Sequence, residues 1–199
     1  MNHILNTMPE VIKTNDLSGK DLTKTPQRVK SYELPKYWDR DYLNARIDAI
    51  PNYQHKMLVK FLWYSGVRIT EAISLIKSNI DFVNYTLTLR WLKSRKYKTR
   101  IAPMHPELKN MLEIYTATMK ADELVFPISR QRAWQLTIKY LGGNPHMIRH
   151  SYAVNWLRCN GDIVILHRIL GHAKIQTTME YLKIVPNDLG KELIKINFR

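Results

Sequence analysis

The sequence predicts an α+β fold that is mainly α-helical, with a small antiparallel β-hairpin. Apolar residues recur at helical spacing along most of the chain, whereas residues 85–91 alternate apolar and polar side chains with the two-residue period of a half-buried strand. Hydrophobic residues make up 45% of the 199 residues, which supports a packed core. A chain of this length accommodates one well-buried domain plus short appendages, so we expect a single domain.

Helices account for most of the expected domain. The second helix is expected to end at Gly66, because glycine tolerates the left-handed cap geometry. Pro106 suits the first position of the helix after the hairpin, and Ser129 can cap the helix that follows. The expected helices lie at about residues 37–50, 57–65, 70–76, 106–115, 130–141, 145–158, 162–170 and 175–185, with another at 189–196.

The hairpin is expected to pair residues 85–91 with residues 99–102. Between these strands, residues 93–98 are too polar for the core and too basic to lie against another positive surface. We therefore expect residues 93–98 to form the exposed tip of the hairpin. A further short strand is expected at residues 124–126.

The two ends of the chain differ from the middle in composition. Residues 1–36 mix polar and charged side chains with few clustered apolar ones, a composition that does not build its own core. We expect a basic and polar arm there, followed by the main domain over residues 37–185. The helical tail, residues 186–199, is apolar enough to dock, either on its own domain or on a neighbouring protomer, and the sequence leaves both arrangements open.

The charge balance points to a polyanionic partner. Lys and Arg number 31 against 17 Asp and Glu, which gives a formal net charge of +14 and a pI near 9.9. A positive field over at least one face favours nucleic acid as the partner. A ribosomal-type role, binding to a membrane surface and simple solubility are the alternatives, and the charge does not name a reaction.

Cysteine content and hydropathy indicate the cellular compartment that we expect for the chain. The single cysteine, Cys159, cannot form an intramolecular disulfide, and the N-terminus lacks the apolar run of a signal peptide, so we expect the cytoplasm. No stretch approaches the ~18 consecutive apolar residues that a membrane span needs. Cys159 falls at an expected helix end, where a packed or half-exposed thiol is expected rather than a nucleophile.

Three segments carry side chains suited to phosphate chemistry. His146 and Arg149 are three positions apart on an expected helix, so both can face one cleft and meet one phosphate. His172 follows a glycine, and Tyr181 lies nine residues further on, on the next helix. Taken singly, each has an ordinary interpretation, either as a solvated helix face or as a core tyrosine whose hydroxyl reaches the surface.

The third segment places Arg68 between a glycine turn and the start of an apolar helix. This is an unusual position for an arginine that serves solubility alone, and a buried arginine needs an anion. A phosphate could be that anion. Glu71, three residues later, could equally supply it from within the protein, as an internal ion pair.

In this order, the three segments resemble the signature of the tyrosine recombinase and integrase family, and the resemblance runs from about residue 37 to residue 182. That family shows Gly-Leu-Arg-x-x-Glu-Leu, a basic hairpin lysine, His-x-Leu-Arg-His-Ser-x-Ala, Leu-Gly-His and Thr-Thr-x-x-Tyr. Here Val67 and Ile148 replace two of the leucines, which are mild changes. The resemblance implies a tyrosine-recombinase-like catalytic domain that cuts and rejoins DNA through a 3′-phosphotyrosine.

The resemblance also implies a role for each site residue. Arg68 and Arg149 would clamp the phosphate that gains charge in the transition state, because guanidiniums stay charged and bind bidentately. His172 would donate a hydrogen bond to that phosphate. Tyr181 would be the nucleophile, helped by cationic surroundings and by a neighbouring acceptor such as His146, since a free phenol has a pKa near ~10.

The general acid would be a lysine of the hairpin, which protonates the departing 5′-oxygen. Lys93, followed by a serine, resembles the family's position best, and Lys96 is the alternative. The other basic side chains of this region are expected to contact the DNA backbone without sequence preference. The expected DNA-contacting residues are Arg95, Lys96, Lys98 and Arg100.

The resemblance implies double-stranded DNA as partner and a homotetramer on that DNA, in a prokaryotic or viral mobile element. No cofactor, metal or nucleotide is expected, because the sequence shows no Walker-type glycine loop, Cys-x-x-Cys pair or carboxylate cluster. Glu71 is expected to orient Arg68. Most family members carry a separate DNA-clamping domain before the catalytic one, so the chain is either a fragment or a minimal recombinase similar to the fimbrial-type invertases.

Two other functions use the same residues. A topoisomerase-like enzyme would nick and reseal DNA without exchanging partners. A DNA-binding regulator would keep the fold and lack the chemistry. Formation of a covalent protein–DNA adduct separates both enzymes from the regulator.

Overall fold

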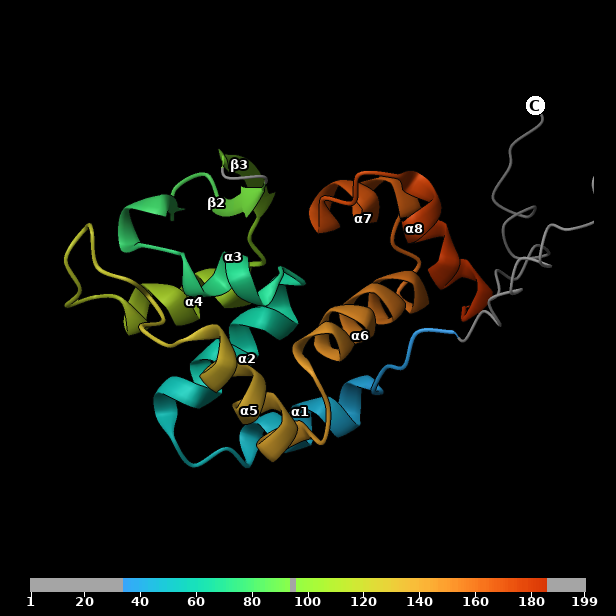
Figure 1. Ribbon diagram of the computed structural model, residues 1–199, viewed down its shortest axis with the longest axis horizontal. Coiled ribbons are helices and arrows are strands. Elements are labelled where there is room, and N and C mark those ends of the chain that lie inside the picture. Colours follow the sequence, from blue (N-terminus) through green and yellow to red (C-terminus); the bar gives the residue numbers. More distant parts are fainter. Residues whose placement is uncertain (1–33, 94–95, 186–199) are drawn as a thin grey trace, which may run out of the picture. The chain divides into compact units, whose positions relative to one another are not determined.

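Helices make up most of the described chain, and one small sheet lies against them (Figure 1). The computed structural model describes residues 34–93 and 96–185, apart from the side chains of residues 92–97. This architecture confirms the expected fold class. The helices are α1 (Arg40–Asp48), α2 (Tyr53–Ser65), α3 (Ile69–Ile73), the 3₁₀ helix η1 (Lys77–Asn79), α4 (Pro106–Tyr115), α5 (Arg130–Leu141), α6 (Pro145–Arg158), α7 (Ile163–Leu170), α8 (Ile175–Met179) and the 3₁₀ helix η2 (Glu180–Lys183).

Side-chain caps explain where the helices begin. Asn52 accepts a hydrogen bond from the backbone of His55 at 2.9 Å, so α2 starts four residues earlier than its apolar spacing indicates. Asp162 caps α7 in the same way. At the other ends, Gly66 and Gly171 both have a φ of 61°, the left-handed conformation that closes a helix.

The sheet contains β1 (Ile80–Asp81), β2 (Thr86–Lys93) and β3 (Lys96–Pro103), antiparallel and in that order. The β2–β3 hairpin is longer than expected, because its backbone pairing continues as far as Lys93 opposite Lys96. The expectation that residues 93–98 form the tip was therefore wrong. Basic residue types do not prevent the backbone of a hairpin from pairing.

Two further expectations were wrong. The strand at residues 124–126 is reduced to a single antiparallel bridge between Ile76 and Leu124. The helix expected over residues 175–185 is divided into the short helices α8 and η2. The arm at residues 1–33 and the helix expected at 189–196 lie outside the described residues.

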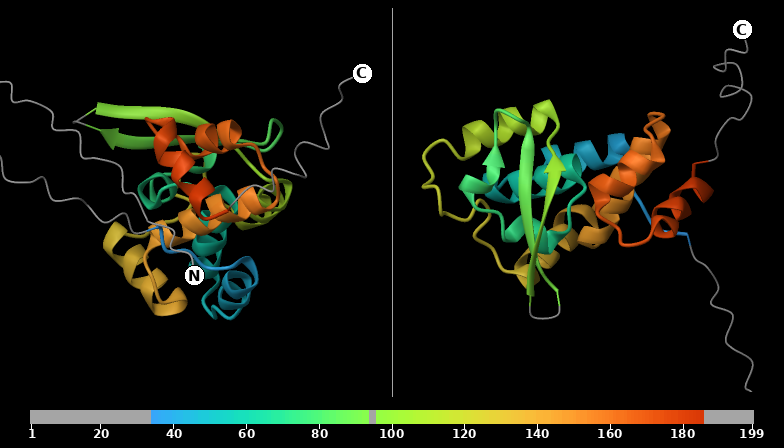
Figure 2. Two further views of the ribbon diagram at one scale, coloured as in Figure 1. Left: turned by 90° about the vertical axis from the view of Figure 1, so that its right-hand side faces the viewer. Right: turned by 90° about the horizontal axis from the view of Figure 1, so that it is seen from above.

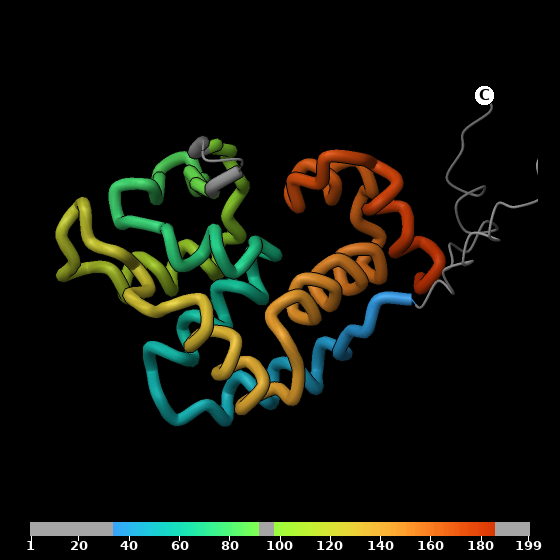
Figure 3. Tube along the Cα trace, in the orientation of Figure 1, coloured from blue at the N-terminus to red at the C-terminus, as the bar shows by residue number. Residues whose placement is uncertain are grey.

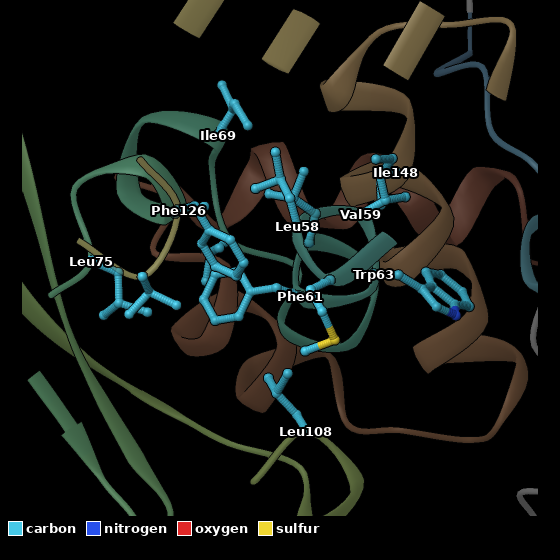
Figure 4. Close-up of a cluster of buried hydrophobic side chains, with 14 of the residues drawn as sticks. Leu58, Val59, Phe61, Trp63, Ile69, Leu75, Leu108, Phe126 and Ile148 are labelled. Atoms are coloured by element: carbon cyan, nitrogen blue, oxygen red, sulfur yellow. The ribbon is translucent and has the colours of Figure 1, made fainter. Parts of the chain in front are cut away.

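The core is divided into two apolar clusters. The larger one contains residues of the helices from α1 through α5 and of the sheet. Phe61 packs there against Phe126, with ring centroids 5.1 Å apart (Figure 4). The smaller one lies between α6, α7 and η2 and includes Leu166, Leu170 and Tyr181. α6 contacts both α2 and η2, and Figure 3 shows the chain coming back towards α6 after α7 and α8.

The β2–β3 hairpin contacts helices that belong to both apolar clusters. β2 contacts α3, while β3 contacts α7. The right-hand view of Figure 2 shows β3 as the hairpin strand nearer to α7. Side chains that β3 directs inward can therefore reach the end of α7.

Candidate active site at the end of α7

The start of α6 places three polar side chains within two turns. Asn144 accepts hydrogen bonds from the backbones of the next helical residues, and Pro145 occupies the first helical position. His146, Arg149 and His150 follow at spacings that bring them to neighbouring positions on one face. His146 is exposed, Arg149 is only 4% exposed and His150 is half-buried.

Arg149 is held by two backbone carbonyls. Its Nη1 donates to Gly66 O at 2.7 Å, and its Nη2 donates to Leu170 O. Burial, together with the positive charge of Arg68, lowers the pKa of the Arg149 guanidinium to about 9, so it is still cationic at neutral pH. A guanidinium has five N–H donors, and these two bonds leave donors for an anion.

Arg68 and Arg100 share one buried carboxylate. Glu71 is fully buried and accepts Arg68 Nη1 at 3.3 Å, Arg100 Nε at 2.9 Å and Arg100 Nη2 at 3.0 Å. Its second oxygen also accepts the backbone N–H of Arg68 at 2.8 Å, which fixes the start of α3. Burial alone would raise the pKa of the Glu71 carboxyl, but the hydrogen bonds and charges of the two arginines outweigh burial and lower this pKa.

Arginines bind three consecutive carbonyls at the C-terminal end of α7. The N–H of Gly171 already satisfies the two preceding carbonyls of the helix. The next three carbonyls accept from side chains, which is how helix ends satisfy groups that lack an intrahelical partner. Ile169 O accepts Arg100 Nη1 at 2.6 Å, Leu170 O accepts Arg149, and Gly171 O accepts Arg68 Nη2 at 3.1 Å.

His172 directly follows this helix end. Its Nδ1 lies 2.9 Å from Thr178 Oγ1 in α8, and His167 Nδ1 lies 3.2 Å from the same oxygen. Burial and the charges of Arg149 and Arg68 lower the pKa of the His172 imidazole to about 3. His172 is therefore neutral at physiological pH and can donate one hydrogen bond.

Tyr181 is buried at the base of the site. Its side chain is 3% exposed, and its Oη lies 2.7 Å from His150 Nδ1. Burial raises the pKa of the Tyr181 phenol, and the charge of Arg149 opposes that rise. Burial lowers the pKa of His150 to about 4, so the neutral imidazole can accept the phenolic proton in a hydrogen bond.

Sequence reasoning did not identify His150. It named His146 as the acceptor for Tyr181, whereas the structure places His150 at hydrogen-bonding distance. The available signal was the spacing of His150 four residues after His146, which brings both imidazoles to the same face of the helix. Cys159 is exposed at the C-cap of α6.

The basic residues of the hairpin fall into different environments. Lys98 is exposed, whereas the side chain of Arg100 points inward and is 12% exposed. The side chains of Lys93 and Lys96 lie outside the described part of the structure, and so does all of Arg95. The roles expected for these three residues therefore stay predictions.

Among the described residues, no three or more His, Cys, Asp or Glu side chains form a group that could hold a metal ion. Within the same ranges, none of the helices combines the length and the apolar character that crossing a membrane requires.

Comparison with known proteins places the chain in a family. Residues 39–187 match the model of the phage integrase family. Tyrosine recombinase XerA from Pyrococcus horikoshii is 26% identical over 211 residues, which cover 98% of this chain and 73% of that protein. The solved catalytic domain of bacteriophage HP1 integrase is 26% identical with a TM-score of 0.61, and the match covers 82% of this chain and 95% of that domain.

A third likeness concerns the fold alone. The crystal structure of XerH site-specific recombinase bound to a palindromic difH substrate has a TM-score of 0.62 at 19% identity. The match covers 82% of this chain and 54% of the XerH chain. The chain belongs to the phage integrase family and has the catalytic fold of tyrosine-type site-specific recombinases.

Proposed function

We propose that this chain is a site-specific DNA recombinase that cuts and rejoins strands through a 3′-phosphotyrosine at Tyr181. The observation that carries the proposal is the convergence of Arg68, Arg149 and His172 at the end of α7. Tyr181 lies close enough for the charge of Arg149 to act on its phenol. Residues from α3, α6 and the segment after α7 thus surround one place where a phosphate can bind.

The two arginines form the phosphate clamp. A phosphodiester in transfer gathers negative charge on its nonbridging oxygens, and preorganised cations stabilise that charge best. The carbonyls at the end of α7 hold both guanidiniums in place before DNA arrives. Arg68 is 32% exposed, which keeps part of its guanidinium accessible to a phosphate.

His172 contributes a neutral donor. If Thr178 donates its hydroxyl hydrogen to Nδ1, the proton of the imidazole is on Nε2, which can donate to a nonbridging oxygen. Because one hydroxyl can donate to only one acceptor, His167 must then donate to Thr178. This chain of hydrogen bonds orients the His172 ring toward the phosphate.

The reaction exchanges one phosphoester bond for another. Tyr181 Oη attacks the phosphorus and passes its proton to the neutral imidazole of His150, while the bond from phosphorus to the 5′-oxygen breaks. The hairpin lysine, Lys93 or its alternative Lys96, protonates the leaving 5′-oxygen. Attack by a 5′-hydroxyl from a second strand reverses these steps and releases Tyr181, so the bond energy is conserved without a nucleotide.

Partners and assembly follow from this chemistry. Exchange between two duplexes cuts four strands, and each cut needs its own tyrosine, so we propose a homotetramer on double-stranded DNA. Lys98, together with Arg95 and Lys96 of the hairpin, would contact the DNA backbone. The tail, residues 186–199, would dock either on its own domain or on a neighbouring protomer, and the single cysteine supports a cytoplasmic location.

Covalent trapping tests the proposal. The protein is incubated with nicked duplexes of randomised central sequence, from which a short cleaved fragment diffuses away, and DNA that stays attached in detergent is sequenced. We expect an adduct on a defined sequence with the natural chain and with Tyr42→Phe, a control at an exposed tyrosine of α1. Tyr181→Phe is expected to give none.

Two results would count against the proposal. An adduct with Tyr181→Phe contradicts the assignment of the nucleophile. Sequence-specific binding by the natural chain without any adduct identifies a DNA-binding protein that lacks the chemistry. Once the site is known, strand exchange between two copies separates a recombinase from an enzyme that only relaxes supercoils.

A further inference from the structure

Arg100 contacts the site from strand β3, whereas the two arginines of the phosphate clamp lie at the start of α3 and in α6. We propose that Arg100 is a positioning residue, which orients Arg68 through their shared carboxylate and fixes the His172 segment by binding the end of α7. This inference rests on the proposed function, because it concerns the same reaction. It replaces the expectation that Arg100 contacts DNA.

The first link runs through Glu71. Arg100 binds both carboxylate oxygens of Glu71, at 2.9 and 3.0 Å, in the bidentate geometry of the strongest side-chain ion pairs. Arg68 Nη1 binds the same carboxylate at 3.3 Å. The position of Glu71, and through it that of the Arg68 guanidinium, therefore depends on Arg100.

The second link runs through the end of α7. Arg100 Nη1 donates to Ile169 O at 2.6 Å. The side chain also packs against Gly171, where an added Cβ would lie 3.0 Å from both Arg100 Cδ and Nε. Arg100 thus holds the backbone just before His172 by a hydrogen bond and by direct packing.

These contacts leave Arg100 poorly suited to bind DNA itself. Three of its nitrogens are engaged within the protein, and its side chain is 12% exposed. Lys98 lies two positions earlier on β3, directed to the same side of the strand, and is exposed. The two residues therefore allow the loss of one positive charge to be compared at a buried position and at an exposed one.

The experiment compares Arg100→Gln with Lys98→Gln on the nicked duplex that traps the natural chain. The rate of adduct formation is measured at saturating DNA, and the Kd and its dependence on salt are measured separately. We expect Arg100→Gln to slow the adduct rate by about tenfold to a hundredfold, because small displacements of catalytic groups carry such penalties. Its Kd is expected to change by less than about threefold, since no phosphate contact is removed.

Lys98→Gln is expected to act on binding instead, with a higher Kd and a smaller salt slope, because it removes a proposed contact to a phosphate. Arg100→Lys retains the charge but lacks the planar fork that binds both oxygens of Glu71, so its rate is expected to fall between those of the natural chain and Arg100→Gln. Thermal unfolding is followed for every variant, and Arg100→Lys provides the decisive rate if Arg100→Gln does not fold.

A substrate with sulfur in place of the leaving 5′-oxygen distinguishes a defect in the phosphate clamp from a defect in the hairpin lysine. Sulfur leaves without being protonated, so this substrate rescues variants in which only the general acid is misplaced. We expect Arg100→Gln to stay slow on the sulfur substrate.

Three results would overturn the inference: an adduct rate equal to that of the natural chain, a loss confined to Kd, or rescue by sulfur. If the natural chain itself forms no adduct, the proposed function fails, which is a different outcome from a fast Arg100→Gln variant.

Discussion

Replacing Glu71 by glutamine tests how much the buried carboxylate contributes to stability. The natural carboxylate is fully buried and accepts four hydrogen bonds from Arg68 and Arg100. Glutamine keeps the size but removes the charge, and its amide group presents N–H donors where the arginines also donate. The variant leaves two guanidiniums close together without their shared anion.

The expected cost can be estimated from this geometry. Removing one partner of a buried ion pair typically costs about 3 to 5 kcal/mol. In a domain of this size, each kcal/mol lowers the Tm by roughly 2 to 4 °C, so Glu71→Gln is expected to lower the Tm by about 6 to 20 °C. Glu113→Gln is the matched control, because Glu113 pairs with Lys109 on the surface of α4 and is 53% exposed. Such pairs contribute at most about 1 kcal/mol.

Thermal unfolding followed by circular dichroism provides the measurement. The sign of the pH dependence follows from the lowered pKa of Glu71. Its stabilising contribution is complete above the usual carboxyl value of 4.5 and is lost as the pH falls through the lower folded value. Glu71→Gln is expected to lack this acid-dependent component. A Tm within about 4 °C of the natural chain, the largest shift expected for the surface control, would refute the reasoning.

Three further predictions concern the groups of the site. Arg149→Lys removes the planar donor fork, so adduct formation is expected to slow by about a hundredfold or more at saturating DNA, while an equal loss in binding would contradict its role. Burial, with nearby positive charges, lowers the pKa values of His150 to about 4 and His172 to about 3, so neither imidazole gains a proton between pH 8 and 6. The single-turnover rate is therefore expected to show no imidazole titration between pH 8 and 6. A change in this rate with its midpoint near pH 6.5, which disappears when either histidine is replaced, would contradict the assignment. Stability is expected to fall below about pH 6.5, where the unfolded imidazoles take up protons that the folded ones do not.

The sequence predicted the elements whose signals are local. Apolar spacing identified most of the helices, and the alternation at residues 85–91 identified the hairpin. Prediction failed where tertiary contacts decide the outcome. The division into α8 and η2 accompanies the hydrogen bonds of Thr178 to two histidines, and periodicity does not encode such contacts.

Part of the candidate site could also be predicted from the sequence. The resemblance supplied Arg68, Arg149, His172 and Tyr181, and the structure brings the first three together at the end of α7. Arg100 could not be assigned from its sequence, because a basic residue on a hairpin strand has the same local pattern whether it points to solvent or into the protein. Only the approach of β3 to α7 shows which of these applies.

The burial of Tyr181 has a consequence for cleavage of DNA at sequences other than the target site. With its hydroxyl bonded to His150 and its ring 3% exposed, the phenol cannot approach a backbone phosphate from solvent. With Tyr181 as the proposed nucleophile, strand cleavage requires the phenol to leave His150 and become accessible, and the free energy of that change adds to the barrier at every site. Under the same proposal, burial of the phenol disfavours cleavage at any DNA sequence that does not stabilise the exposed tyrosine.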